Sequence, residues 1–211
     1  VQGTTNNSQI AVTHITYNAQ GLQEKVYLPY RIGHVIAYQG EDTGKPKTTY
    51  TYDAVGRVTQ VTNPDGTQVR TDYNGFQTAA RDENNHLKIY ENDAFGRLKT
   101  VKEYDGTHAT LNWGATVYAT TQYSYNRLDL LESVTDAASN TTTITYDQVG
   151  NKLQMVDPDM GTWNYTYDDA GNLLSQTDAR GKRIWFYYDQ ANRLKGKNYC
   201  DSCSKPAAAE E

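Results

Sequence analysis

The sequence repeats one short cluster of residues, Tyr-Asp-x-x-Gly, at a fixed interval. Its two clearest copies are Tyr146-Asp147-Gln148-Val149-Gly150 and Tyr167-Asp168-Asp169-Ala170-Gly171. Related clusters begin at Tyr125 and Tyr188, so that four successive copies start 21 residues apart. A period of this length is typical of repeat architectures in which each copy is one supersecondary unit.

Earlier copies of the cluster are less regular. They begin at Tyr52, Tyr73 and Asn92, at intervals of 21 and 19 residues, and a degenerate first copy begins at Tyr17. The 19-residue interval contains Tyr73-Asn74-Gly75-Phe76, a turn two residues tighter than the others. The two longest intervals predict insertions of 14 and 12 residues.

Each copy contains a second turn, which predicts a hairpin. The second turn begins 11 residues after the Tyr in the regular copies, as in Asn63-Pro64-Asp65-Gly66 and Asp178-Ala179-Arg180-Gly181. The period therefore accommodates two strands of about six residues and two turns of about four or five. The 18 Tyr residues fit pleated, half-exposed β surfaces. The predicted fold is all-β: an antiparallel meander of about seven hairpins that forms a curved sheet or part of a spiral.

The strand that leads into each cluster is predicted to have one apolar face. The residue two positions before the Tyr is mostly aromatic or aliphatic, as at Tyr165 before Tyr167, and the residue between them is mostly polar, as at Thr166. Side chains alternate between the faces of a strand, so the Tyr column belongs to the apolar face.

The turn itself has a predicted chemistry. The residue after the Tyr is always Asp or Asn, which can accept a hydrogen bond from the N–H two residues on and so close an Asx-turn. The fifth residue is Gly, Asn or Asp, the types that best tolerate positive φ. The assigned motif residues are Tyr52, Asp53, Gly56, Asp93, Gly96, Tyr125, Asn126, Tyr146, Asp147, Gly150, Tyr167, Asp168, Gly171, Tyr188, Asp189 and Asn192.

The clusters resemble the YD repeat of RHS proteins. The resemblance rests on residues 52–58 followed by 63–66, and on residues 167–173 followed by 178–181, and it extends from about Tyr50 to Leu194. RHS proteins include bacterial polymorphic toxins, the C component of insecticidal toxin complexes, and animal teneurins. The resemblance implies a hollow β shell, which in the bacterial toxins encloses a C-terminal toxin, and it implies carbohydrate binding for some members.

The predicted organisation has three parts: a degenerate first repeat with an insertion at 1–47, a YD-repeat shell segment at 48–198 that is interrupted near 107–121, and a polar tail at 199–211. At ~4.8 Å per strand, 14 to 16 strands give a sheet about 70 Å wide, which is too narrow to close a container. We therefore expect further shell segments, or self-association, as partners. The start at Val1 is typical of the inside of a longer chain or of a processed terminus.

Composition and motifs exclude several classes of function. A net charge of −5 without a basic block argues against a nucleic-acid partner. No apolar run approaches the roughly 20 residues of a membrane span. No Gly-x-Ser-x-Gly, phosphate-binding loop or His-Glu-x-x-His is present. Most carboxylates occupy turn positions of the repeat, where closing the turn already explains them. We expect no enzymatic activity and no cofactor.

Metal binding and cysteine chemistry have weak signals. Residues 157–161 superficially resemble a calcium loop, but they lack a third acidic ligand and the distal Glu, so we expect no metal. The four His residues are isolated from one another in the sequence: His14, His34, His86 and His108. Cys200 and Cys203 form a single Cys-x-x-Cys, which is either a small disulfide or two free thiols.

Three tryptophans are candidates for contact with a glycan or another partner: Trp113 in the second insertion, and Trp163 and Trp185 in strands. The alternative is packing against the sheet, which we favour because aromatic residues recur in every period. The favoured function is a structural shell segment around a toxin cargo. The alternative is an extracellular adhesion or carbohydrate-binding protein or fibre. Either function places the protein outside the cell or at its surface, with a cytoplasmic stage before export as the alternative location.

Overall fold

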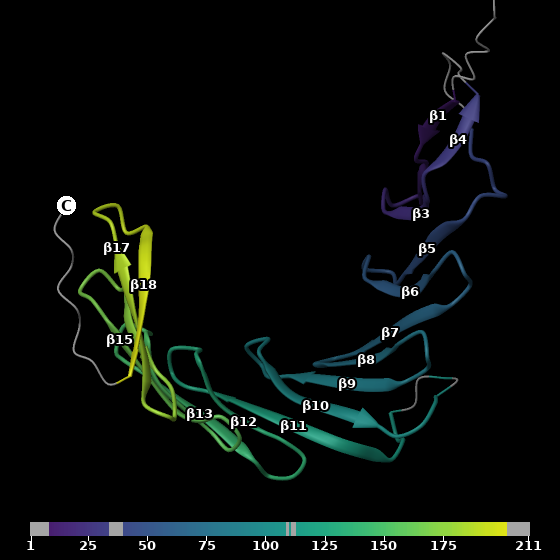
Figure 1. The fold of residues 1–211 in the computed structure, drawn as a ribbon. Helices are drawn as coiled ribbons and strands as arrows, with labels where there is room; N and C mark the ends of the chain where they lie inside the picture. Colours follow the sequence, from purple (N-terminus) through teal and green to yellow (C-terminus); the bar gives the residue numbers. More distant parts are fainter. Residues whose placement is uncertain (1–8, 34–39, 109, 111–112, 202–211) are drawn as a thin grey trace, which may run out of the picture. The chain divides into compact units, whose positions relative to one another are not determined.

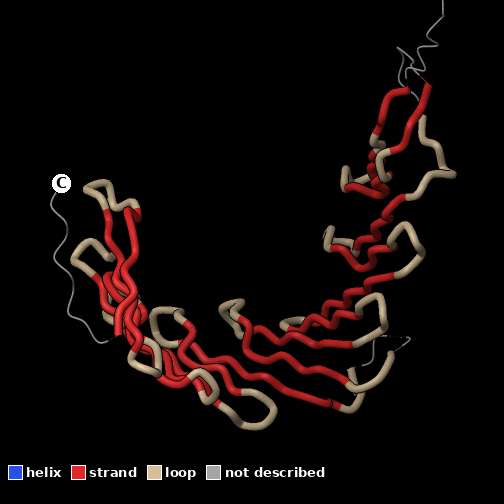
Figure 2. Tube along the Cα trace, viewed as in Figure 1, coloured by secondary structure: helices blue, strands red, loops and turns tan. Residues whose placement is uncertain are grey.

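The structure is a computed structural model that describes residues 9–33, 40–108, 110 and 113–201. Within these residues every helix or strand assigned is a β-strand (Figures 1 and 2). The strands are β1 (Gln9–Val12), β2 (Ile15–Tyr17), β3 (Gln23–Tyr27), β4 (Tyr30–Gly33), β5 (Lys47–Tyr52), β6 (Val58–Thr62), β7 (Gln68–Asn74), β8 (Gln77–Arg81), β9 (Leu87–Asn92), β10 (Leu98–Tyr104), β11 (Val117–Tyr125), β12 (Leu131–Thr135), β13 (Thr141–Tyr146), β14 (Lys152–Asp157), β15 (Gly161–Tyr167), β16 (Leu173–Thr177), β17 (Lys182–Tyr188) and β18 (Leu194–Asp201).

The strands form an antiparallel meander. Strands β2, β3 and β5 to β18 make one sixteen-stranded sheet in which the order of strands in space follows the order in the chain. The two turns of each period alternate along the chain, and neighbouring strands such as β13 and β14 pair antiparallel. This arrangement confirms the predicted all-β meander. Strands β1 and β4 pair with each other in a separate two-stranded sheet, which the sequence pattern did not predict.

The chain divides into two compact units. Unit 1 comprises residues 1–96 and 102–118, and unit 2 comprises residues 97–101 and 119–211. Each unit is described by itself below. The domain boundaries expected from the sequence, at residues 47 and 198, stay a prediction.

Exposure alternates along the strands as the sequence pattern predicts. In β13, Ile144 and Tyr146 are half-buried, whereas Thr143 and Thr145 are exposed. The same alternation occurs at the end of β15, where Tyr167 is half-buried and Thr166 is exposed. Most residues on the face of the Tyr column are only half-buried. The sheet is a single layer, so each of these side chains is covered mainly by its neighbours on the same face.

The core of unit 1 lies on the face of the sheet opposite the Tyr column. Ala79, Leu87, Ile89 and Tyr104 form a buried cluster there, and Trp113 packs against it. Ala79 pairs directly with Ile89, which places both on one face. The described part of the second insertion thus covers this apolar cluster. In other repeats the same face of the sheet is mostly polar. Leu111 of the same insertion lies outside the described residues.

The described part of the first insertion is anchored by a buried tyrosine. Tyr27 at the end of β3 is 1% exposed, and its hydroxyl donates a hydrogen bond to Glu41, which also accepts one from Lys25 Nζ at 2.9 Å. Burial, and then the Glu41 carboxylate, raise the pKa of Tyr27 to about 12. The pairing holds residues 40–46 beside β3, so the excursion returns to the sheet before β5.

Candidate functional site: the repeated turn

The turn after each Tyr is closed by the carboxylate that follows it. At Asp147, Oδ1 accepts hydrogen bonds from the N–H groups of Val149 at 3.0 Å and Asn151 at 2.8 Å. The side-chain amide of Asn151 donates to Oδ2 at 2.9 Å. Gly150 has a φ of 95°, in the region that L side chains rarely adopt. The predicted Asx-turn is therefore present, with both carboxylate oxygens in use.

The same geometry recurs along the chain, in every regular repeat that the sequence predicts. The residue at the fifth position has positive φ whether it is Gly, Asp or Asn. The values are 86° at Gly56, 82° at Gly96, 60° at Asp129, 95° at Gly150, 82° at Gly171 and 59° at Asn192. The second turn of the period uses the same device, since Asp136 Oδ1 accepts from the N–H groups of Ala138 and Asn140.

The choice between Asp and Asn follows the residue four positions later. Asp residues are followed there by a donor: Arg57 Nε donates to Asp53 Oδ2 at 2.7 Å, and Arg193 Nε donates to Asp189 Oδ2 at 2.8 Å. Asn126 is instead followed by Leu130, which donates only its backbone N–H, at 3.1 Å. A second anionic oxygen would have no donor at this position, so the neutral amide replaces it. Asn18, followed by Leu22, obeys the same rule.

A β-bulge accompanies the regular turns. Ser124 pairs with Ser133 but Tyr125 pairs with Leu131, so Glu132 is an extra residue on β12. Equivalent register shifts occur at Tyr17, Tyr52, Tyr146, Tyr167 and Tyr188. A bulge disrupts the backbone hydrogen bonds between the two strands locally. It leaves main-chain N–H or C=O groups that need another hydrogen-bond partner.

The tyrosine of the following repeat supplies that partner. Tyr146 OH donates to the carbonyl of Leu131 at 2.8 Å, which is the residue that faces the preceding Tyr at the bulge. Contacts of the same kind include Tyr52 OH to Gln23 O at 2.6 Å, Tyr73 OH to Val58 O at 3.1 Å, Tyr125 OH to Leu98 O at 2.9 Å and Tyr188 OH to Leu173 O at 3.2 Å. We call this series the tyrosine ladder. The ladder explains why the column is Tyr and not Phe, which sequence reasoning missed. The signal was the hydroxyl at seven of the eight column positions, all except Asn92.

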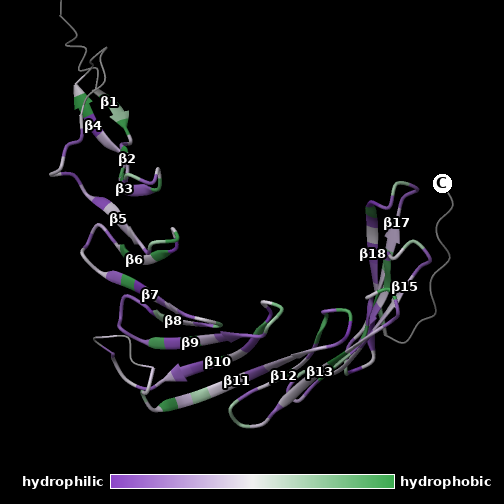
Figure 3. Ribbon diagram, turned by 180° about the vertical axis from the view of Figure 1, so that it is seen from behind, coloured by the Kyte–Doolittle hydropathy of each residue, from purple (hydrophilic) through white to green (hydrophobic). Residues whose placement is uncertain are grey.

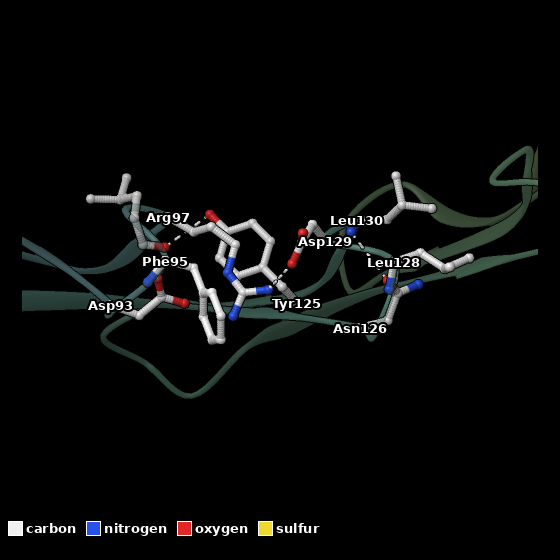
Figure 4. Close-up of polar contacts among 9 residues, drawn as sticks. Asp93, Phe95, Arg97, Tyr125, Asn126, Leu128, Asp129 and Leu130 are labelled. Carbon is white, nitrogen blue, oxygen red and sulfur yellow. Dashed lines mark hydrogen bonds and ion pairs between the residues drawn. The ribbon is translucent and has the colours of Figure 1, made fainter.

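Arginine reinforces two rungs of the ladder. In unit 2 the Arg97 guanidinium lies 4.8 Å from the centre of the Tyr125 ring and forms an ion pair with Asp129 (Figure 4). In unit 1 the Arg57 guanidinium lies 4.1 Å from the centre of the Tyr73 ring. Each arginine belongs to the turn of one repeat and covers the tyrosine of the next, so the contact joins successive repeats.

The sequence of these repeats matches a known family model. The family model described as RHS Repeat matches residues 32–68, 52–91 and 167–198. The chain contains RHS repeats within these residues.

Solved structures with the same RHS-repeat fold are components of Tc toxins. The crystal structure of TcdB2-TccC3 without the hypervariable C-terminal region matches with a TM-score of 0.73 and 21% identity, over 92% of this chain and 11% of that chain. The Photorhabdus luminescens Tc holotoxin pore, with a substituted TccC3, matches with a TM-score of 0.71 and 19% identity, over 93% of this chain and 11% of that one. The RHS-repeat chain thus spans about a tenth of the length of these structures, and at such identity the likeness shows the fold.

Hydrogen bonds in the RHS-repeat turns alter the acidity of the carboxylates. The side-chain amide of Asn140, and then its backbone N–H, lower the pKa of Asp136 below its ordinary value. The backbone N–H of Arg193, followed by its guanidinium, does the same to Asp189. Burial raises the pKa of Tyr146. The hydrogen bonds in the turns favour the charged form of each carboxylate, and burial favours the neutral form of the tyrosine. The neutral tyrosine is the form that donates a hydrogen bond in the ladder.

The three candidate contact tryptophans have different surroundings. Trp113 packs on the core of unit 1. In unit 2, Trp163 donates Nε1–H to the carbonyl of Met160 at 3.2 Å and lines an open groove of about 700 Å³ with Tyr199 and Arg180. Trp185 is 9% exposed, lies on the opposite face of the sheet and has the guanidinium of Arg183 5.4 Å from its ring. Trp163 and Trp185 therefore do not form one platform.

The remaining candidate chemistry is sparse. No group of three or more His, Cys, Asp or Glu side chains in the described residues could hold a metal ion. No helix suited to crossing a bilayer is found in the described part of the chain. Cys200, near the end of β18, is disulfide-bonded, whereas Cys203 and His34 lie outside the described residues.

Proposed function

We propose that this chain is a structural segment of an RHS shell, and that the shell walls in a toxin cargo of a secreted protein. The observation that carries the proposal is the tyrosine ladder. Its hydroxyls and turn carboxylates are directed at the protein's own backbone, as Tyr146 is at Leu131 and Asp147 at Asn151. Side chains used in this way build a wall; they are not displayed to a substrate.

The shell role is supported by the relatives and by the ends of the sheet. The matching structures are Tc toxin components about ten times longer than this chain. Strands β2 and β18 stand at the ends of the sixteen-stranded order, so each has one side without a strand neighbour in the described sheet. An open strand edge readily accepts another strand. The remaining shell is therefore the first partner that we propose, and the toxin cargo is the second.

An enzymatic role is not proposed. The carboxylates that are abundant in this chain accept backbone hydrogen bonds in turns, as Asp168 does from Ala170 and Asn172. The disulfide at Cys200 suits an oxidising environment, which supports a secreted or surface location.

The proposal is tested with the full product of the gene, carrying a marginally stable passenger protein fused at its C-terminus. We expect the passenger to survive protease far longer there than when it is fused to the 211-residue chain alone, because only a complete wall excludes protease. Equal cleavage in both fusions would contradict the shell role.

The competing role, adhesion through carbohydrate, has its own signature. The groove beside Trp163 is the place where an aromatic ring and a cation could meet a sugar. A monomeric chain that binds a common polysaccharide, with binding lost in Trp163→Ala and retained in Tyr118→Ala, would favour adhesion over the shell.

A further inference from the structure

Asn74 differs from the other residues that directly follow the Tyr column. In the regular repeats the side chain at this position accepts hydrogen bonds from main-chain N–H groups of the turn, as Asn126 does from Leu128 at 2.9 Å and Leu130 at 3.1 Å. The side chain of Asn74 makes no hydrogen bond within the described residues. Its amide therefore has no role in closing the turn.

The tight turn also leaves the next main-chain nitrogen without a partner. Strands β7 and β8 lie side by side (Figures 1 and 3), and Asn74 pairs with Gln77 across a loop of two residues, Gly75 and Phe76. Gly75 has a φ of 59°, at the first central position of the loop, where such hairpins favour glycine. The N–H of Gly75 makes no hydrogen bond within the described residues, and residues 74–76 are all exposed.

These two groups can react with each other. When the main-chain nitrogen of Gly75 attacks the side-chain amide carbon of Asn74, a new C–N bond closes a five-membered imide. The amide group leaves as ammonia and takes with it the proton that the Gly75 nitrogen loses. Water then opens the imide at either carbonyl, which gives aspartate or isoaspartate. Glycine favours the attack because it has no Cβ to obstruct it and adopts the widest range of backbone conformations.

The other asparagines are less suited to this reaction. Asn74 is the only asparagine in the sequence that is followed by glycine. Asn63 precedes Pro64, whose main-chain nitrogen carries no hydrogen. The side-chain amide of Asn172 donates to Asp168 Oδ2 at 3.0 Å, and the residue after it begins strand β16. Sequence and structure therefore single out the same position.

We propose that Asn74 is a site of spontaneous covalent modification in the folded protein, which converts it to aspartate and isoaspartate, and that the isoaspartate form loosens the β7–β8 hairpin. The inference does not depend on the proposed shell function.

The loosening follows from the geometry of the turn. Isoaspartate brings the side-chain carbon into the main chain and so lengthens it by one atom. The register of β7 and β8 is continuous up to Asn74 and Gln77, so the turn has no extra residue that could absorb the change. The carbonyl of Phe76, in the same turn, accepts a hydrogen bond from the Asn92 N–H at 2.9 Å. The effect of the modification should therefore extend to the next repeat.

The test incubates the folded 211-residue chain at mildly alkaline pH and follows its asparagines by peptide mass spectrometry. Asn74 is expected to change from amide to acid sooner than Asn63 and Asn172, which are controls in the same sample. Its peptide is expected to separate into an aspartate and an isoaspartate form, and methylation by a protein isoaspartate methyltransferase identifies the second. The matched variant Asn74→Gln cannot close a five-membered ring and is expected to stay intact.

Hydrogen–deuterium exchange of the incubated proteins measures the consequence. Exchange in β7 and β8 is expected to be faster in the wild type than in Asn74→Gln, and equal in β13 and β14. The variant Asn74→Asp adds the charge without lengthening the main chain and should exchange like the fresh wild type. Loss of Asn74 no sooner than Asn172, or only when urea unfolds the chain, would overturn the site. Unchanged exchange in a chain that carries isoaspartate would overturn the loosening.

Discussion

The regular repeat that begins at Tyr146 and the shortened repeat that begins at Tyr73 close their hairpins differently. The first has an Asx-turn at Asp147 and a register shift at Tyr146. The second joins β7 to β8 through Gly75 and Phe76 alone, and its register from Arg70 to Asn74 is continuous, without a bulge. Both tyrosines nevertheless donate to the preceding repeat, Tyr73 to Val58 and Tyr146 to Leu131.

The difference teaches that a rung of the ladder depends on the repeat before it. The repeat that follows the missing bulge has Asn92 where the others have Tyr. Its backbone N–H donates to the carbonyl of Phe76 at 2.9 Å, so the main chain takes over at the tight turn. Bulge and tyrosine are thus a matched pair across two successive repeats, and they are absent together.

The largest expected effect concerns the left-handed turn residue of the regular repeats. Gly171 has a φ of 82°, and a Cβ there would meet nothing within 4 Å, so the cost of a side chain is a backbone cost. Gly171→Val should lower the free energy of unfolding by about 1–3 kcal/mol. Gly171→Asn should cost much less, because Asn192 already has a φ of 59° at the equivalent place. Urea denaturation measures both, with Gly196→Ala as a control away from positive φ. Equal losses for Val and Asn would contradict the assignment.

The tyrosine ladder provides the next effect. Tyr146→Phe removes the hydrogen bond to Leu131 and keeps the ring, so it should lower the free energy of unfolding by about 1 kcal/mol. Tyr199→Phe, at a side chain 69% exposed, is the control and should change little. Denaturation midpoints of the two variants at neutral pH check the difference. If Tyr146→Phe were as stable as the wild type, the ladder would be a by-product of the bulge.

Acid should weaken the regular repeats. The pKa values of Asp136 and Asp189 lie below the ordinary value because donors surround the charged form. A carboxyl whose folded pKa is depressed contributes stability that is present above the unfolded pKa, near 4, and is lost as pH falls through the folded value. The melting temperature should therefore fall as pH drops from about 5 toward 2. Asp136→Asn should flatten this dependence, and a melting temperature that rises on acidification would contradict it.

The smallest expected effect is that of chelation, which should be nil. Asp157 Oδ1 accepts hydrogen bonds from the N–H groups of Asp159 and Met160, and its Oδ2 accepts one from the Thr142 hydroxyl. The loop is closed by protein donors, so a cation is not needed to hold it. The melting temperature after exhaustive dialysis against chelator should equal that before. A fall that calcium restores would show that this turn is a metal site.

The sequence predicted the period, the hairpins, the turns and the polarity of the two faces, because each of these depends on residues a few positions apart. Asp53 and Gly56 could be assigned to a turn from their spacing alone. The tyrosine ladder could not, since it joins segments from different hairpins. The bulges lie within one hairpin and were not predicted. Packing of Trp113 was favoured, but the sequence did not say which residues it packs against. The apolar patch of Ala79 and Ile89 interrupts the face that the sequence predicted to be mostly polar, and the structure shows Trp113 of the insertion packed against it.

Every rung of the ladder has a direction: the donor lies in the later repeat and the acceptor in the earlier one. During synthesis the earlier hairpin leaves the ribosome first, with its bulged carbonyl already in place, and the next tyrosine meets a finished surface. Growth of the sheet from the N-terminus therefore never waits for residues that have not been made. For the same reason a gene can gain repeats at the later end without altering those that precede them, and the length of the sheet is set by how many times the unit is copied.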